Sequence, residues 1–163
     1  MAGNNFTGNI TKTFSGISLD SNIPVISSMK PASNINPTHN NNTVLNEKSI
    51  GYTLSEAHRL LTITFTRTAG AVDNTVHTKT YNSIGSSELS QGSHINTNIG
   101  LDNNTELVRG AIYKIEFTGT DLAGNDAEKK TVNNVLYKPT HIPVDTSYLL
   151  DFVESSNVDW NTN

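Results

Sequence analysis

The sequence is marked first by what it lacks. It contains no cysteine, which excludes disulfide bonds, thiolate nucleophiles and zinc–thiolate sites. Charged residues make up only 16% and hydrophobic residues 34% of the chain, so both the charges that decorate helices and the aliphatic side chains that fill large cores are scarce. No apolar run approaches the roughly 18 residues that a membrane-spanning helix needs. We therefore expect no membrane insertion.

Positive charge and catalytic motifs are also missing. The net charge of −4, the pI near 5.6 and the absence of any Lys or Arg run exclude a basic face for nucleic acid. No Gly-x-Ser-x-Gly elbow and no Gly-rich phosphate loop with a lysine occurs. The sequence therefore predicts a protein that is not an enzyme.

Asn and Thr, at about one residue in seven or eight each, take the place of the missing residues. Both have low helix propensity, whereas Thr suits a pleated strand and Asn suits turns. The chain length of 163 residues fits one domain with extra tails. The opening "MAGNNFTGN" lacks the basic start and apolar region of a secretory signal, so either the protein stays inside the cell or the chain is a mature or excised piece.

Two segments carry clear strand patterns. In "RLLTITFTRT", Leu61, Ile63 and Phe65 alternate with threonines, which places the apolar set on one face. "GAIYKIEFTGT" repeats the pattern with Tyr113, Ile115 and Phe117 pointing inward. Weaker strands are predicted over Ile23 to Ser27, Lys48 to Leu54, Thr75 to Tyr81 and Lys130 to Tyr137.

Short connections separate these strands. "KPASNINPTHNNN", "TAGAVDN" and "GLDNN" are typical of surface loops, and "SEAHRLL" predicts a turn between two strands rather than one turn of helix. Several short strands at this spacing predict an all-β fold, an antiparallel sandwich.

The start of the chain looks like a second copy of a segment near its end. Ordered matches at nearly constant offset join Asn5–Asn9 to Asp121–Asn125, Thr13–Ile17 to Thr131–Val135, and Ile23–Val25 to Ile142–Val144. Gly16 and Asn134 occupy equivalent places where the two-residue alternation breaks. Because both residue types tolerate a left-handed backbone, we predict a β-bulge there.

The segments "YTLSEAHRLLTITFTRTAG", "LVRGAIYKIEFTGTDLAGN" and "VNNVLYKPTHIPV" resemble bacterial immunoglobulin-like domains found in tandem in very large surface and adhesin-type proteins. In that family, a Y-x-I-x-F-like strand enters an Asp-x-Ala-Gly-Asn turn, and a linker with Pro-Val begins the next domain. The match is carried by Tyr113, Ile115, Phe117, Asp121, Ala123, Gly124, Asn125, Pro143 and Val144. It departs from the family in the opening copy, where Asn5 and Thr7 replace the turn Asp and Ala.

This resemblance implies an immunoglobulin-like β-sandwich over residues 23–144, preceded by a strand segment at 1–22 and followed by a tail or linker at 145–163. It also implies an extracellular location at the cell surface and an adhesive or structural role. Neighbouring immunoglobulin-like domains or identical subunits are the expected partners.

The opening strand segment needs a partner, because a lone strand leaves its backbone and apolar side chains uncovered. Its apolar residues, which form the proposed assembly strand, are Phe6, Ile10, Phe14, Ile17 and Leu19. Two explanations remain open. The segment is a remnant of a preceding domain in a tandem protein, or it adds to the sheet of a neighbouring subunit and propagates a fibre.

The alternative function is a binding module for a surface glycan or another cell-surface ligand. Its contacts would lie in the polar stretches Pro31 to Thr43 and Gly85 to Asn104, since long polar loops suit adaptable hydrogen bonding.

The turn "DLAGNDAE" is the one candidate metal site. Asp121, Asn125 and Asp126 offer the oxygen ligands that calcium prefers, although the spacing is not that of a helix-loop-helix calcium loop. The competing interpretation is that Asp121 and Asn125 hydrogen-bond the backbone of their own turn. No other cofactor is expected.

The remaining candidates favour ordinary roles. His39, His58, His77, His94 and His141 show no metal-ligand spacing, so we expect exposed or turn histidines. Sequons at Asn5, Asn9, Asn41 and Asn103 are weak signs of glycosylation in a chain so rich in Asn and Thr. Trp160, the only Trp, is a poor platform for sugar stacking by itself.

Overall fold

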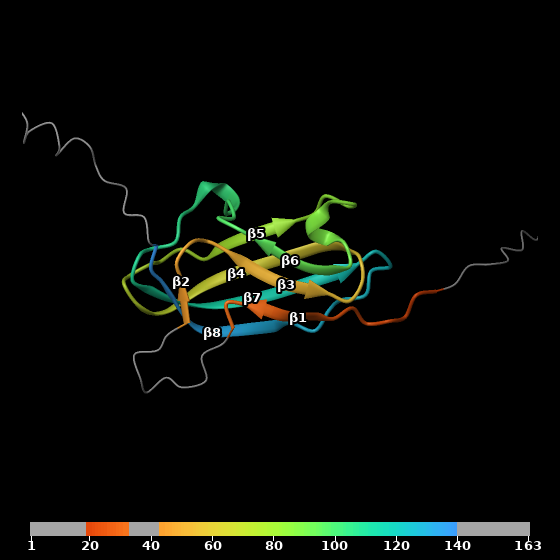
Figure 1. Ribbon diagram of the computed structural model, residues 1–163, viewed down its shortest axis with the longest axis horizontal. Helices are drawn as coiled ribbons and strands as arrows, with labels where there is room; N and C mark the ends of the chain where they lie inside the picture. The colour runs from red at the N-terminus through yellow and green to blue at the C-terminus, as the bar shows by residue number, and fades with distance from the viewer. Residues whose placement is uncertain (1–18, 33–42, 140–163) are drawn as a thin grey trace, which may run out of the picture.

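The computed structural model describes residues 19–32 and 43–139, and in this part the chain forms two packed β-sheets (Figure 1). The three-stranded sheet has the order β1 (Ile26–Lys30), β3 (Ile50–Leu54) and β6 (Gly92–Asn96). The five-stranded sheet has the order β2 (Thr43–Leu45), β8 (Lys130–Tyr137), β7 (Ala111–Asp121), β4 (His58–Gly70) and β5 (His77–Tyr81).

The strands of both sheets pair almost entirely antiparallel. All neighbours are antiparallel except β2 and β8, because the chain leaves the three-stranded sheet after β1 and joins the other sheet alongside β8. The Tyr113 hydroxyl accepts a hydrogen bond of 2.9 Å from the backbone N–H of Val108, five residues upstream. Such a tyrosine corner is a hallmark of immunoglobulin-like sandwiches. The predicted all-β sandwich is confirmed, with two packed sheets of three and five strands.

The core lies between the sheets and is built mainly by β4 and β7. Ile63 pairs with Phe117 and Phe65 pairs with Ile115, and all four side chains are fully buried. The intervening threonines point away from the core and are half-buried. The alternation read from the sequence therefore gave the correct faces of both strands.

Three predicted strands begin too early, each for a local reason. β1 starts at Ile26 rather than Ile23, because the Val25 N–H donates to the Ser55 hydroxyl instead of a backbone carbonyl of β3. β3 starts at Ile50 rather than Lys48, because Ser49 N–H turns back to the Glu47 carbonyl at 2.5 Å. β5 starts at His77 rather than Thr75, because the Thr75 N–H bonds the Asp73 side chain instead. β8 has the predicted bounds.

Two other local predictions are confirmed. Asn134 has a φ of 58°, and the register between β7 and β8 shifts next to it, so β8 carries a bulge there. Ser55 and Glu56 form a bend between β3 and β4, with no helical turn.

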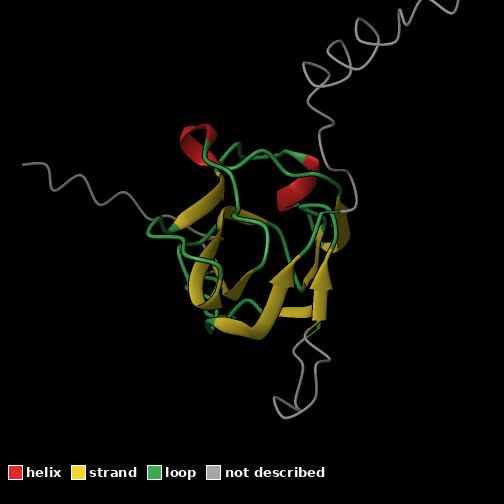
Figure 2. Cartoon of the chain, turned by 90° about the vertical axis from the view of Figure 1, so that its left-hand side faces the viewer, coloured by secondary structure: helices red, strands yellow, loops and turns green. Residues whose placement is uncertain are grey.

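Some elements were not predicted from the sequence. β2 and β6 are short, and the 3-10 turns η1 (Ser87–Leu89) and η2 (Asp102–Asn104) lie on the same side of the sandwich (Figure 2). No helix among the described residues is long and apolar enough to cross a membrane.

Candidate functional site

The turn after β7 is held together by the side chain of Asp121. Its Oδ1 accepts hydrogen bonds from the backbone N–H groups of Gly124 (2.6 Å) and Asn125 (2.8 Å), and its Oδ2 accepts one from the Asn125 side-chain amide (2.9 Å). The Asn125 carbonyl in return accepts a bond from the Asp121 N–H at 3.0 Å. Burial by itself raises the pKa of Asp121, but these hydrogen bonds outweigh it and lower the pKa. The interpretation of the turn as self-bonded is therefore confirmed.

Two further carboxylates converge on this turn from distant parts of the chain. One ligand oxygen each from Asp20, Glu56 and Asp121 lies within 4.8 Å of the other two. Asp20 is placed there by the Asn125 side-chain amide, which donates to the Asp20 carbonyl at 3.1 Å. Glu56 comes from the bend between β3 and β4. We call this group, Asp20, Glu56 and Asp121, the acidic trio.

The acidic trio differs from the calcium ligand set predicted from the sequence. The structure keeps Asp121 but turns Asp126 away, because the Asp126 Oδ1 accepts a hydrogen bond from the Thr120 hydroxyl at 2.8 Å. The Asn125 side-chain nitrogen faces this turn, where it donates to the Asp20 carbonyl and to Asp121 Oδ2. Three neighbouring carboxylates supply hard oxygen ligands, or repel one another when nothing lies between them. Calcium binding at this end of the sandwich stays a prediction.

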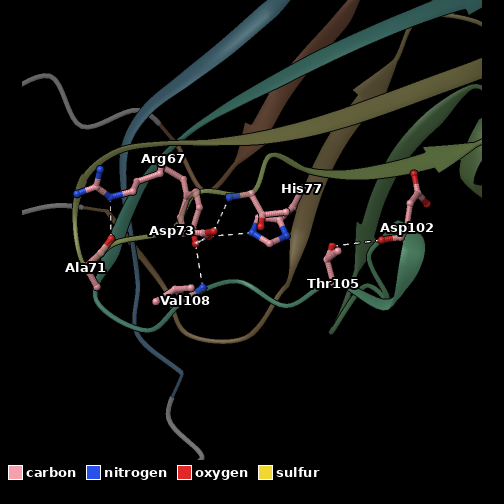
Figure 3. A network of polar contacts seen from close by, with 9 residues as sticks. Arg67, Ala71, Asp73, His77, Asp102, Thr105 and Val108 are labelled. Atoms are coloured by element: carbon pink, nitrogen blue, oxygen red, sulfur yellow. Dashed lines mark hydrogen bonds and ion pairs between the residues drawn. The ribbon is translucent and has the colours of Figure 1, made fainter.

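A second polar group is buried near the opposite end of the sandwich, and it was not predicted. Asp73 lies in the loop after β4 with a side chain only 4% exposed. Its Oδ2 lies 2.8 Å from His77 Nε2 (Figure 3). The same oxygen accepts a hydrogen bond from the Tyr113 hydroxyl at 2.5 Å, and Oδ1 accepts one from the Thr75 N–H at 3.0 Å. Burial raises the pKa of Asp73, but these bonds overcome that effect and lower it.

The loop that carries Asp73 is also fastened at its start. Arg67 Nε donates to the Ala71 carbonyl at 2.7 Å (Figure 3). An Arg67 terminal nitrogen also donates to the Gly70 carbonyl at 2.8 Å. Ala71 N–H in turn donates to the Gly110 carbonyl at 3.0 Å. Asp73, Tyr113 and Val108 thus tie the loop after β4 to the segment before β7.

The pair His77–Asp73 resembles the base and orienting acid of a catalytic triad, but its surroundings serve folding. His77 is 2% exposed, and its Nδ1 is buried without a hydrogen-bond partner among the described residues. Tyr113 packs against the ring at 6.3 Å between centroids. The His77 ring is thus closed off from solvent in this structure.

The expectation of exposed or turn histidines is wrong for two of the five. His58 and His77 begin β4 and β5 and point inward, with exposed fractions of 1% and 2%. A backbone carbonyl, that of Glu56, satisfies His58 Nδ1 at 2.9 Å. The His58 ring fits against β7 because Gly119 has no side chain, and a Cβ there would lie 2.7 Å from His58 Cδ2.

Several predicted residues lie outside the described part of the chain. They are the assembly-strand residues Phe6, Ile10, Phe14 and Ile17, together with Gly16, His39, His141, Trp160 and the sequons at Asn5, Asn9 and Asn41. The fifth assembly-strand residue, Leu19, is described. It is 87% exposed and belongs to no strand. Asn103 lies exposed in η2.

The proposed binding stretch Gly85 to Asn104 is not a free loop. It contains η1, β6 and η2, and its residues Leu89, Ile99 and Leu101 are buried in the core. Asp102 bonds β5 instead of facing outward freely, since its carboxylate accepts from the Thr78 and Thr80 hydroxyls at 3.0 and 2.8 Å. The other stretch, Pro31 to Thr43, is described only at its ends.

No protein-family model, curated protein or solved structure matches this chain.

Proposed function

We propose that this chain is a non-catalytic, extracellular structural or adhesive module that stacks end to end. Stacking takes place within a tandem array of similar domains, or by strand exchange between subunits into a fibre. The single observation that supports this proposal best is the path of the chain through the sandwich.

The described chain arrives at one end of the sandwich and leaves at the other (Figure 1). Asp20 is bonded at the turn between β7 and β8, whereas Tyr137 O accepts a hydrogen bond from Gly110 N–H at the start of β7. β7 has 11 residues, which corresponds to about 35 Å between the two places at the usual rise per residue. Modules joined through such opposite ends extend a line rather than folding back on one another.

The segment before β1 is fixed to this arriving end. Val25 and Ser55 exchange two bonds: the Val25 N–H donates to the Ser55 hydroxyl at 2.8 Å, and the Ser55 N–H donates to the Val25 carbonyl at 3.0 Å. The Asn125–Asp20 bond adds a second attachment. A preceding domain would therefore meet the sandwich at a defined place.

Apolar side chains are exposed along the same segment. Leu19, Ile23 and Val25 are 87%, 70% and 48% exposed. Exposed apolar groups gathered in one place commonly mark contact surfaces. They give a neighbouring domain or subunit something to cover at the end where it would sit.

The test is size-exclusion chromatography and negative-stain imaging of the full chain, beside a variant that lacks residues 1–18. Monomers from both support the tandem-array form. Filaments from the full chain that vanish in the shortened variant support strand exchange, and filaments that survive the deletion overturn it.

A second experiment tests stacking itself. Two copies of the full chain joined in series should scatter X-rays as an extended rod. A scattering curve showing two domains folded side by side would contradict end-to-end stacking in either form.

A further inference from the structure

Sheet edges need protection, because their unpaired N–H and C=O groups can recruit another strand. In the described part of the chain, the two sheets have four outermost strands: β1, β6, β2 and β5. β5 is covered by η2, where Asp102 Oδ1 accepts from the backbone N–H of Thr80 at 3.3 Å and Oδ2 binds two hydroxyls. An aspartate thus occupies the edge that a foreign strand would need.

Two of the other edges are also unsuited to pairing. β1 is distorted, since Ser28 has a φ of 51° and the register shifts between Ser27 and Lys30. Pro31 follows directly and offers no donor. β2 is only three residues long. Bulges, prolines and short strands are the devices by which natural sheets block their edges.

β6 has none of these devices. Its sequence, "GSHIN", contains no Asp, Glu, Lys, Arg or Pro, and it pairs with β3 in an unbroken register over all five residues. Ser93 and Ile95 are exposed, Ile95 at 66%. No backbone group of β6 bonds anything but β3 within the described residues.

The pairing of β3 with β1 determines which backbone N–H and C=O groups of β6 point away from β3. Ser55 N–H donates to the Val25 carbonyl, and the register continues through Ser27 opposite Thr53. In antiparallel strands the backbone groups alternate between the two sides, so Thr53 faces β1 whereas Tyr52 and Leu54 face β6. Their partners on β6 are His94 and Gly92. The N–H and C=O groups of Ser93 and Ile95 therefore point outward.

We propose that this edge binds a second copy of the chain, with β6 pairing antiparallel to β6 of the copy about a two-fold axis at His94. In this register Ser93 of each copy lies opposite Ile95 of the other. Both N–H groups and both carbonyls of each strand then find partners, which gives four backbone hydrogen bonds and leaves no outward group unpaired. The two three-stranded sheets become one continuous sheet.

Three features favour a second copy of this chain as the binding partner of β6. The strand carries no formal charge, so identical strands bring no like charges together. The outward donors and acceptors of Ser93 and Ile95 are self-complementary about the axis. The two exposed Ile95 side chains become diagonal neighbours on the outer face and can cover each other.

A five-residue edge buries little surface, so the pairing between two single chains is weak and dissociates readily. Several modules arranged in a line would engage together and gain affinity through their number. Lateral pairing of this kind connects modules side by side and is independent of the end-to-end contact proposed above.

The first test uses the full chain at concentrations up to about 1 mM, where weak pairs form. We expect dimers by sedimentation equilibrium, with amide NMR shifts of Ser93 and Ile95 that change with concentration. Ile95→Pro removes an outward donor without removing a bond to β3 and should weaken the dimer by about tenfold. Ile95→Lys should weaken it too, whereas Ile84→Lys, at a side chain 69% exposed in a loop, should not.

The second test traps the pair, because the natural chain has no cysteine. His94→Cys places two thiols opposite each other at a non-hydrogen-bonded pair, about 4.5 Å apart between Cα atoms and within disulfide range. It should cross-link faster than Ile84→Cys. Equal cross-linking rates, or shifts at Ser93 and Ile95 that do not depend on concentration, overturn the proposal. If deletion of residues 1–18 abolished the dimer, that segment, rather than β6 of a second copy, would be the partner of β6. This result would also refute self-pairing.

Discussion

The Tyr113 hydroxyl is the point at which the buried polar network can be tested most cleanly. Tyr113→Phe removes one oxygen and changes little else in shape. That oxygen accepts from Val108 N–H at 2.9 Å and donates to the Asp73 carboxylate at 2.5 Å, in a residue that is fully buried. The substitution leaves one backbone donor and one carboxylate oxygen without this partner.

The two lost hydrogen bonds set the size of the effect. A neutral hydrogen bond contributes about 1 kcal/mol to stability and one to a charged group about 1.5–3 kcal/mol. We therefore expect Tyr113→Phe to lower the free energy of unfolding by about 3 kcal/mol. This loss in the free energy of unfolding exceeds that expected for removing a hydroxyl with no charged partner. The reason is that the Asp73 carboxylate stays buried but loses one hydrogen-bond donor.

Urea denaturation followed by fluorescence or circular dichroism measures this difference, with the slope against denaturant showing whether the two-state comparison is valid. Tyr137→Phe is the matched control. Tyr137 is also buried, at 8% exposure, but its hydroxyl has no hydrogen-bond partner among the described residues, so we expect a change under about 0.5 kcal/mol. Equal losses in the two variants would refute the role assigned to the Tyr113 hydroxyl.

Three further outcomes are expected from the same structure. Gly119→Ala should destabilise the protein by about 1–3 kcal/mol, since its Cβ would meet His58 Cδ2 at 2.7 Å, and a wild-type melting temperature in this variant would contradict that packing. Because the pKa of Asp73 is lowered in the folded state, its carboxylate stabilises the fold above about pH 4 and this contribution is lost as the pH falls further; urea titrations at several pH values should show a shallower acid loss for Asp73→Asn. If calcium binds the acidic trio, calcium should raise the melting temperature of the wild type but not of Glu56→Gln, and no difference between calcium and chelator in the wild type would exclude the site.

For strands that bury one face and expose the other, the residue pattern was sufficient to predict the strand and its inward face. β4 and β7 alternate apolar residues with threonines or charges, and both were predicted with their inward faces correct. β8 was predicted with its bounds, and Asn134 marked the place of its bulge. β2 was missed, since its three residues form a strand only by lying beside β8, from which they are far in sequence. β6 was missed because "GSHIN" has little apolar pattern of its own.

The same holds for the polar groups: contacts between residues close in sequence could be predicted, and contacts between residues far apart in sequence could not. The self-bonded turn of Asp121 and Asn125 depends on neighbours in sequence and could be predicted. Asp20 reaches Asn125 across 105 positions, and Asp73 reaches Tyr113 across 40, so neither contact has a local signal. The burial of His77 could have been suspected from Asp73, four residues earlier, only with the fold in hand.

The parallel pairing of β2 with β8 bears on how the module would respond to tension. β8 leads to the departing end, and β2 follows the segment that arrives at the other. Once β1 has separated from β3, a force that stretches the molecule along its length would pull these two strands in opposite directions, parallel to themselves. Their hydrogen bonds lie across that direction and would have to rupture together rather than one after another. A short parallel seam placed in this way would therefore resist stretching by the shearing of several bonds at once rather than by their opening in sequence.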